Sequence, residues 1–226
     1  MTTKKDRPII FGGEMVRAIL DGRKTQTRRV VRPQPTGLSH GIPVWSFRDV
    51  HTGKETRCPY GQPGDRLWVR ETWAPICGGH FIASYALAAD ADEARGAVFR
   101  ADGRVKSDGV MMPVTTTIEN GFIEDAGSIR WRPSIHMPRW ASRITLEITD
   151  VRVERVQDIS DGDAKAEGVD DGAPRGGLAC YGPEPDPYGP VRNAFADLWD
   201  SLHPRADEDW IDNPWVWVIT FKRVAP

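Results

Sequence analysis

The segment Gly22–Arg29, with the sequence GRKTQTRR, carries the residues best suited to chemistry. It places one lysine, three arginines and two threonines within eight positions. Neighbouring positive charge disfavours the ammonium form of Lys24, so we expect this lysine to lose its proton easily. A desolvated lysine can then act as a general base, and the hydroxyl of Thr27 can attack a carbonyl carbon. The alternative interpretation is a solvated basic turn.

The elements around this segment decide whether these two side chains can meet. A hydrophobic helix pattern over about residues 14–21 runs into the segment and stops at Gly22, a residue typical of helix ends. On a regular strand, residues three apart face opposite sides of the sheet. Lys24 and Thr27 can therefore meet only if the segment forms a turn, a bulge or a helix end.

Alternating apolar and polar residues predict four strands elsewhere, over residues 9–11, 66–71, 143–156 and 215–221. Further helices are predicted after an N-cap at residues 160–163, over residues 193–202 and, from alanine content, over residues 83–97. Residues 36–61 and 170–190 are predicted to be mostly loop. Few helices, separated strands and no alternating strand-helix rhythm favour an α+β fold, a small β-barrel with peripheral helices.

A composition of 39% hydrophobic and 27% charged residues describes an ordinary soluble chain. A length of 226 residues suits one domain with elaborate loops or a small domain pair, and we expect a single domain, residues 1–226. No signal peptide or membrane-spanning run is visible, so no membrane partner is expected. Three scattered cysteines without a CxxC pair favour a reducing cytoplasm.

Charge is distributed unevenly although the net charge is only −2. Residues 1–32 hold nine Lys or Arg against three Asp or Glu, and residues 183–212 hold two against eight. This asymmetry suggests a bipolar surface with an anion-binding side, compatible with nucleic acid but not with indiscriminate duplex binding.

Motifs for metals and common cofactors are missing from the sequence. The five histidines have no partner at metal-ligand spacing, and His136 alone merits attention. Phosphate-binding, dinucleotide-binding and serine-hydrolase motifs do not occur. We therefore expect no metal and no cofactor.

A second basic segment, residues 130–143, holds four arginines, two tryptophans, one histidine and no acid. Arginines that contact phosphate and aromatics that stack on bases are usual in single-strand recognition. Salt-sensitive binding of single-stranded RNA or DNA is therefore expected from Arg130, Arg132, Arg139 and Arg143. The alternative is that Trp131 and Trp140 are core anchors flanked by arginines whose stems cover them.

Together, these motifs resemble the ASCH family, a branch of the PUA-like β-barrels. The resemblance rests on the helix leading into GRKTQTR, the Pro63-Gly64-Asp65 turn with its strand, and the terminal strand ending in Ile219-Thr220-Phe221. Residues 58–65 and 134–141 are similar to larger ASCH proteins of bacteriophages and prophages. Long loop insertions at about residues 75–130 and 170–192 match nothing in the family.

The resemblance implies an activity and a site. Small ASCH amidohydrolases that deacetylate 4-N-acetylcytidine carry a Lys-Thr-Glu triad, which matches Lys24, Thr27 and Glu167 here. The chain is about twice as long as those enzymes, so its insertions could reshape or occlude the cleft. Side chains expected to bind the ligand are Arg23, Thr25, Arg28, Trp68, Arg70, Glu71, Arg139 and Trp140.

The predicted function is removal of an acyl group from a modified cytosine-type base or nucleoside. The partner would be a nucleoside, a nucleotide or a single-stranded nucleic acid. One alternative is a non-catalytic module that binds RNA or a modified base, and another is a metal-dependent ribonuclease, which the missing ligand cluster makes less attractive.

Overall fold

The computed structural model describes residues 4–35, 37–39, 46–76, 96–102, 105–107, 110–112, 131–169, 189–205 and 207–224. Its backbone forms two compact units, each assembled from separate stretches of the chain. Unit 1 comprises Met1–Lys5, Ala18–Arg66 and Leu146–Arg223. Unit 2 comprises Asp6–Arg17, Leu67–Thr145 and Val224–Pro226.

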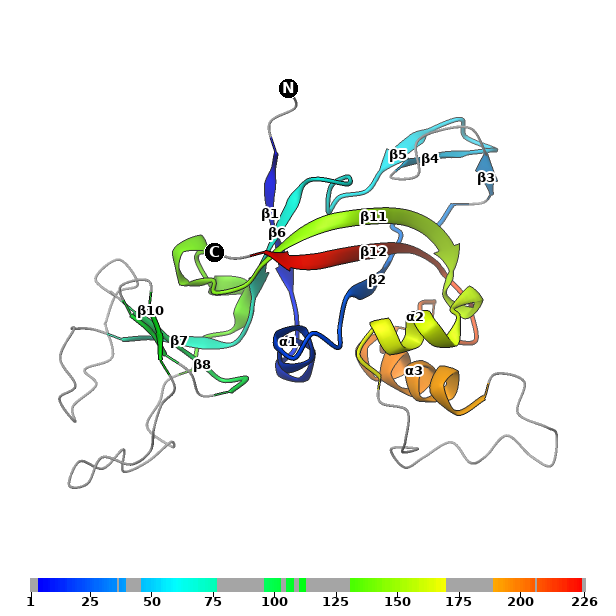
Figure 1. Ribbon diagram of the computed structural model, residues 1–226. Coiled ribbons are helices and arrows are strands. Elements are labelled where there is room, and N and C mark those ends of the chain that lie inside the picture. The colour runs from blue at the N-terminus through cyan, green and yellow to red at the C-terminus, as the bar shows by residue number, and fades with distance from the viewer. Residues whose placement is uncertain are drawn as a thin grey trace, which may run out of the picture. The chain divides into compact units, whose positions relative to one another are not determined.

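The largest sheet has five strands in the order β1-β6-β11-β12-β2 (Figure 1). The strands are β1 (Asp6–Ile10), β2 (Gln26–Val30), β6 (Arg66–Arg70), β11 (Thr145–Arg155) and β12 (Trp215–Val224). All four predicted strand regions contribute to it, which confirms their type, and β2 joins them. Among the described residues, the strand pairings run from β1 at one edge to β2 at the other, and β1 and β2 do not pair with each other. The described part of this α+β fold is therefore an open sheet. The barrel stays a prediction.

A three-stranded sheet that was not predicted lies within the region expected to be mostly loop. It has the order β3-β4-β5, with β3 (Leu38–Ser39), β4 (Ser46–Asp49) and β5 (Glu55–Arg57). The carboxylate of Asp49 accepts hydrogen bonds from the backbone of His51 and Thr52, and this turn joins β4 to β5. The strands are short and polar, so they carry no alternating apolar pattern that would reveal them.

A four-stranded sheet in unit 2 has the order β10-β9-β8-β7. Its strands are β7 (Trp73–Ile76), β8 (Gly96–Phe99), β9 (Val105–Ser107) and β10 (Val110–Met112). The alanine-rich helix predicted over residues 83–97 falls outside the described residues up to position 95. Its last residue, Ala97, lies in β8 opposite Pro75, so the helix prediction was wrong there.

Three α-helices lie close to their predicted positions: α1 (Gly13–Leu20), α2 (Asp161–Ala166) and α3 (Gly189–Leu202). Single 3-10 turns occur at η1 (Ser134–His136), η2 (Arg139–Ala141) and η3 (Val156–Asp158). The loop predicted over residues 170–190 lies almost wholly outside the described residues. None of the described helices has both the length and the apolar character that crossing a bilayer requires.

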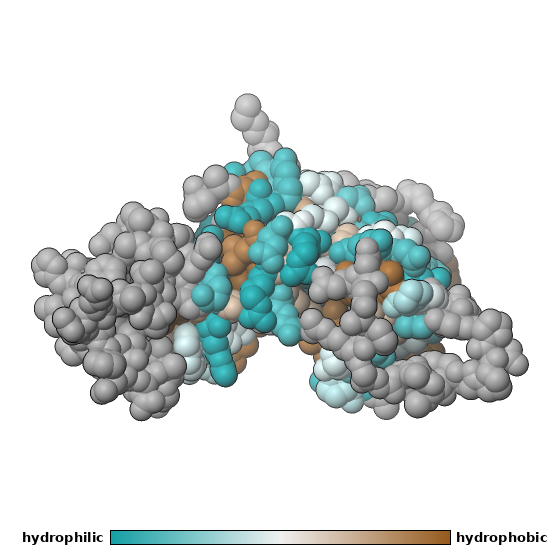
Figure 2. Space-filling model, turned by 60° about the horizontal axis from the view of Figure 1, so that its bottom comes forward, coloured by the Kyte–Doolittle hydropathy of each residue, from teal (hydrophilic) through white to brown (hydrophobic). Residues whose placement is uncertain are grey.

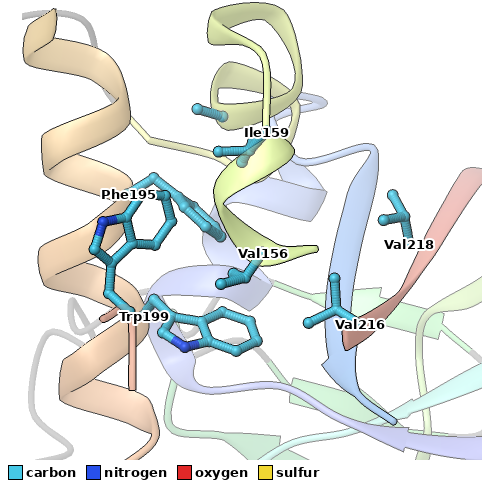
Figure 3. Close-up of a cluster of buried hydrophobic side chains, with 8 residues drawn as sticks. Val156, Ile159, Phe195, Trp199, Val216 and Val218 are labelled. Atoms are coloured by element: carbon cyan, nitrogen blue, oxygen red, sulfur yellow. The ribbon is translucent and has the colours of Figure 1, made fainter. Parts of the chain in front are cut away.

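The core of unit 1 forms where α3 packs on the end of the sheet. Phe195 and Trp199 project from α3 toward Val156, the first residue of η3, and Val216 on β12 (Figure 3). Trp210, Ile159, Ala164 and Val218 complete this buried cluster. The cluster thus holds α2 and α3 in place, and α2 leads directly into Glu167.

On the face of the molecule drawn in Figure 2, hydrophilic side chains lie between the apolar ones.

Candidate active site

The segment that carries Lys24 is an ordered connection in unit 1. Gly22 has φ +76°, in the left-handed region that favours glycine, and so ends α1. The backbone N–H groups of Arg23 and Lys24 both donate to the carbonyl of Ala18, at 2.9 and 3.0 Å. Thr25 N–H then donates to the carbonyl of Ala166. Backbone hydrogen bonds thus tie the segment to α1 and α2 before β2 begins.

Lys24 and Glu167 form a buried ion pair across 143 positions of sequence. Lys24 Nζ donates to Glu167 Oε2 at 2.5 Å and to the Glu167 carbonyl at 2.8 Å. The lysine side chain is 0% exposed and the glutamate side chain 5%. Glu167 ends α2, whose first turn is capped by the Ser160 hydroxyl. The structure therefore brings together two of the three residues that the resemblance implied.

One carboxylate oxygen of this pair has no hydrogen bond. Within the described part of the chain, Glu167 Oε1 is buried and without a hydrogen-bond partner. Arg28 Nη1 lies 3.7 Å from this oxygen, which is beyond hydrogen-bonding distance. An unsatisfied buried acceptor costs about 1–3 kcal/mol, more when it is charged. Such a group is a natural position for a ligand that donates a hydrogen bond.

Electrostatics around Lys24 favour an easily lost proton. Burial is the largest effect and lowers the lysine pKa, because the charged form loses its hydration. The carboxylate of Glu167 opposes this change, whereas the charges of Arg29 and Arg28 add to it. The pKa of Lys24 is therefore lowered overall, as the cluster of cations in the sequence predicted.

Arg28 lies inside unit 1, with a side chain that is 0% exposed. Its guanidinium donates to Gln26 Oε1, to Glu154 Oε2 at 3.2 Å and to Asp163 Oδ2 at 3.4 Å. Asp163 also accepts from Gln26 Nε2 at 2.9 Å. These contacts tie β2 to α2 and β11, so the arginine predicted to bind a ligand is engaged by side chains of the protein itself.

Thr27 is buried in the middle of β2, where it pairs with Ile219 of β12. Successive strand residues face opposite sides, so Thr27 lies on the other face of β2 from Gln26 and Arg28. Among the described contacts it makes no hydrogen bond to Glu167. The structure thus assembles the lysine and the glutamate without joining the threonine to that carboxylate.

Arg23 and Thr25, also predicted ligand contacts, are exposed. Arg23 donates to the carbonyl of Gly168 at 3.5 Å and pairs with Asp21 at 3.3 Å. The Gly168 contact places the Arg23 guanidinium next to the residue that follows Glu167. Arg23 and Thr25 therefore both combine exposure with proximity to the ion pair.

The other predicted ligand contacts belong to unit 2. Arg70 and Arg139 both stack over the ring of Trp68, with guanidinium carbons 4.7 and 5.9 Å from its centroid. Trp140 is 41% exposed and meets Trp73 edge to face. These stacks combine cations and aromatic faces on one unit, and Trp140 and Arg139 are exposed there.

Glu71 differs from these residues because it is engaged inside unit 2. Its carboxylate accepts two hydrogen bonds from Arg143, at 2.8 and 2.9 Å, and both side chains are buried. Burial raises the pKa of Glu71, and Arg143 partly offsets the change. Arg143, predicted to contact nucleic acid, also donates to Asp102 at 2.7 Å. Arg130, predicted with it, lies outside the described residues.

Sequence reasoning missed the residues that surround the ion pair. Gln26, Asp163, Glu154 and Arg152 bind Arg28 or one another, and no pattern in the sequence links the three segments that carry them. The N-cap pattern before α2 was the one available signal for Asp163. Among the described residues, no three His, Cys, Asp or Glu side chains lie close enough to hold a metal ion.

Comparisons with known proteins add little to this description. No protein-family model matches the chain, and no curated protein matches it. Among solved structures, the crystal structure of protein EF3133 from Enterococcus faecalis V583, of family DUF984, covers 99% of this chain and 82% of its own. The sequence identity is 10% and the TM-score 0.40, which is too low to assign a fold or a function.

Proposed function

We propose that this chain is an ASCH-type protein with a PUA-like barrel, and that it hydrolyses the amide of an acylated cytosine-type base or nucleoside. The observation that carries the proposal is the buried Lys24–Glu167 pair, whose carboxylate keeps one oxygen without a hydrogen bond. A buried lysine with a lowered pKa is the usual form of a lysine general base.

In the proposed reaction, neutral Lys24 removes the proton of the Thr27 hydroxyl as its oxygen attacks the acyl carbon. The carbon–nitrogen bond then breaks, and the leaving amine takes up the proton, which Lys24 and Glu167 share through their hydrogen bond. Water then hydrolyses the acyl ester on Thr27, which releases the acid and restores the hydroxyl. Thr27 lies on the face of β2 opposite Arg28, so the reaction requires a local change in the β2 backbone that brings its hydroxyl to the pair when substrate binds.

A second candidate is a module that binds RNA or a modified base without catalysis. The observation in its favour is the set of arginine–tryptophan stacks in unit 2, with exposed Trp140 and Arg139. Exposed indole rings stack on bases, and arginines contact phosphates. Binding of an acylated nucleoside without turnover would favour this candidate, and chelator-sensitive cleavage of RNA would favour a nuclease.

The test is hydrolysis of 4-N-acetylcytidine by wild-type protein and by Lys24→Arg, Thr27→Val and Glu167→Gln. Each variant should lower kcat by at least about 10²-fold, because each removes a proton-transfer group or the nucleophile. Lys24→Arg should fail because a guanidinium does not release its proton at physiological pH. Double variants should lose little more than single ones, since the residues act as one unit.

Thr220→Val is the matched control for Thr27→Val. Thr220 lies on β12 next to Ile219, the partner of Thr27, and its own partner is Gln26. It should retain the wild-type rate. A wild-type protein that releases no acetate from the nucleoside contradicts the proposed hydrolysis.

A further inference from the structure

We propose that the substrate of this site must carry a hydrogen on the nitrogen of its scissile amide, so that the site takes secondary amides and rejects N-alkylated amides and esters. The inference rests on the proposed function and deepens it. The juxtaposition that supports it is a buried carboxylate with one oxygen bound to Lys24 and the other without a hydrogen bond.

Two basic side chains lie beside the Glu167 carboxylate. Lys24 contacts it directly, and Arg28 approaches its free oxygen to 3.7 Å from β2, with Arg29 further along the same strand. The nearby acids form ion pairs with Arg28 and Arg152. Asp163 on α2 and Glu154 on β11 bind Arg28, and Arg152 binds both. An ionised carboxylate accepts hydrogen bonds and donates none, so a ligand that binds at Glu167 Oε1 must supply a hydrogen-bond donor.

No group in the described part of the chain satisfies this oxygen. Lys24 Nζ is directed at Oε2 and at the backbone carbonyl of the same residue. Arg28 Nη1 donates to Gln26, and Arg28 Nη2 donates to Glu154 and Asp163. These three partners hold the guanidinium 3.7 Å from Glu167 Oε1, which is too far for a hydrogen bond. The capacity of Oε1 to accept a hydrogen bond is therefore unused.

A secondary amide supplies the missing donor at the chemically useful atom. Its N–H lies on the nitrogen whose bond to the acyl carbon breaks, so a hydrogen bond to Oε1 holds the leaving nitrogen against the carboxylate. That carboxylate is bonded to Lys24, which holds the proton that the leaving nitrogen needs. One contact therefore selects the substrate and positions its leaving group. Because Oε1 is buried, the surrounding side chains must part when the substrate enters.

The experiment compares three acetylated cytidines with wild-type protein. They are 4-N-acetylcytidine, its 4-N-methyl derivative and 5′-O-acetylcytidine, which are a secondary amide, a tertiary amide and an ester. Each kcat/KM is divided by the rate of hydroxide hydrolysis of the same compound, which removes differences in intrinsic reactivity. The secondary amide should exceed both others by at least about 10²-fold, because a buried polar group rejects an analogue that leaves it unpaired.

Binding to Glu167→Gln gives a readout that does not need turnover. Lys24 still requires an acceptor, so the glutamine oxygen should face it and place the NH₂ group, which cannot accept, at the Oε1 position. Calorimetry on Thr27→Val, which lacks the nucleophile and so does not consume the amide, should therefore show tighter binding of the secondary amide than of its N-methyl derivative. The double variant Thr27→Val/Glu167→Gln should show no such preference.

The outcomes separate the two proposals. Equal normalised rates for the secondary and tertiary amides, or a preference for the ester, overturn the inference and leave the hydrolase in place. Equal affinity of Thr27→Val for the two amides also overturns it. Hydrolysis of none of the three compounds overturns the proposed function, and the inference with it.

Discussion

At the residue scale, the Lys24–Glu167 pair has a consequence for stability that does not depend on catalysis. Both side chains are almost fully buried. Removing one partner leaves an uncompensated charge, so Lys24→Met and Glu167→Leu should each destabilise the protein by about 3–5 kcal/mol. The double variant replaces the pair by apolar side chains and should be much less destabilised than the sum of the singles.

Urea unfolding at neutral pH measures all four proteins of this cycle. A double variant that loses as much stability as the two single variants together would show that the residues do not interact. Because single substitutions unfold part of the population, activity tests of the pair use the closer replacements Lys24→Arg and Glu167→Gln.

At the scale of elements, the end of α2 positions the carboxylate. Gly168 follows Glu167 with φ +90°, and a Cβ there would lie 3.1 Å from Ala18 Cβ and 3.3 Å from Lys24 Cβ. Gly168→Ala should therefore cost about 1–3 kcal/mol of stability through backbone strain, and lower the activity by displacing Lys24. Thermal unfolding and acetylcytidine hydrolysis check both effects.

Gly162→Ala is the matched control inside α2. A Cβ there meets no atom closer than Ser160 Oγ at 3.8 Å, and alanine favours the helix. It should leave activity unchanged and raise stability by roughly 0.5 kcal/mol. Equal effects of the two substitutions would show that the end of α2 does not constrain the pair.

At the scale of the whole molecule, the basic and acidic stretches of the sequence meet in unit 1. Arg32, from the basic stretch, donates to both oxygens of Glu208, at 2.7 and 2.5 Å. This hydrogen bonding is the main reason that the pKa of Glu208 is lowered. The folded pKa lies below the unfolded value, so the pair stabilises the protein above the ordinary glutamate range and loses this effect as pH falls through the folded pKa.

Arg32→Gln should therefore lower the free energy of unfolding by about 1 kcal/mol at pH 7, discounted for the exposure of the arginine. The difference from wild type should shrink below about pH 4. Arg57→Gln is the control, since its pair with Glu55 is exposed and should have little effect. A difference that persists unchanged to low pH would contradict a role for this pair.

Local patterns in the sequence were enough to predict many elements. The end of α1 at Gly22, the Ser160 cap of α2 and the strands β6, β11 and β12 follow from spacing and turn chemistry within a few residues. The resemblance also implied a triad of Lys24, Thr27 and Glu167, of which the structure brings Lys24 and Glu167 together. The short polar strands β4 and β5 lacked such a pattern and were missed.

The environments of the charged residues were decided by the tertiary structure. Sequence alone predicted that Arg28 and Glu71 bind a ligand, yet each is buried against a partner that the fold supplies, Glu154 and Arg143 among them. The same holds for the oxygen of Glu167 that lacks a hydrogen bond. A side chain's type and spacing are local properties, which the sequence determines by itself. Whether a charge is buried, and by what it is neutralised, depends on distant segments, 72 residues away for Glu71 and 126 for Arg28, that only folding brings together.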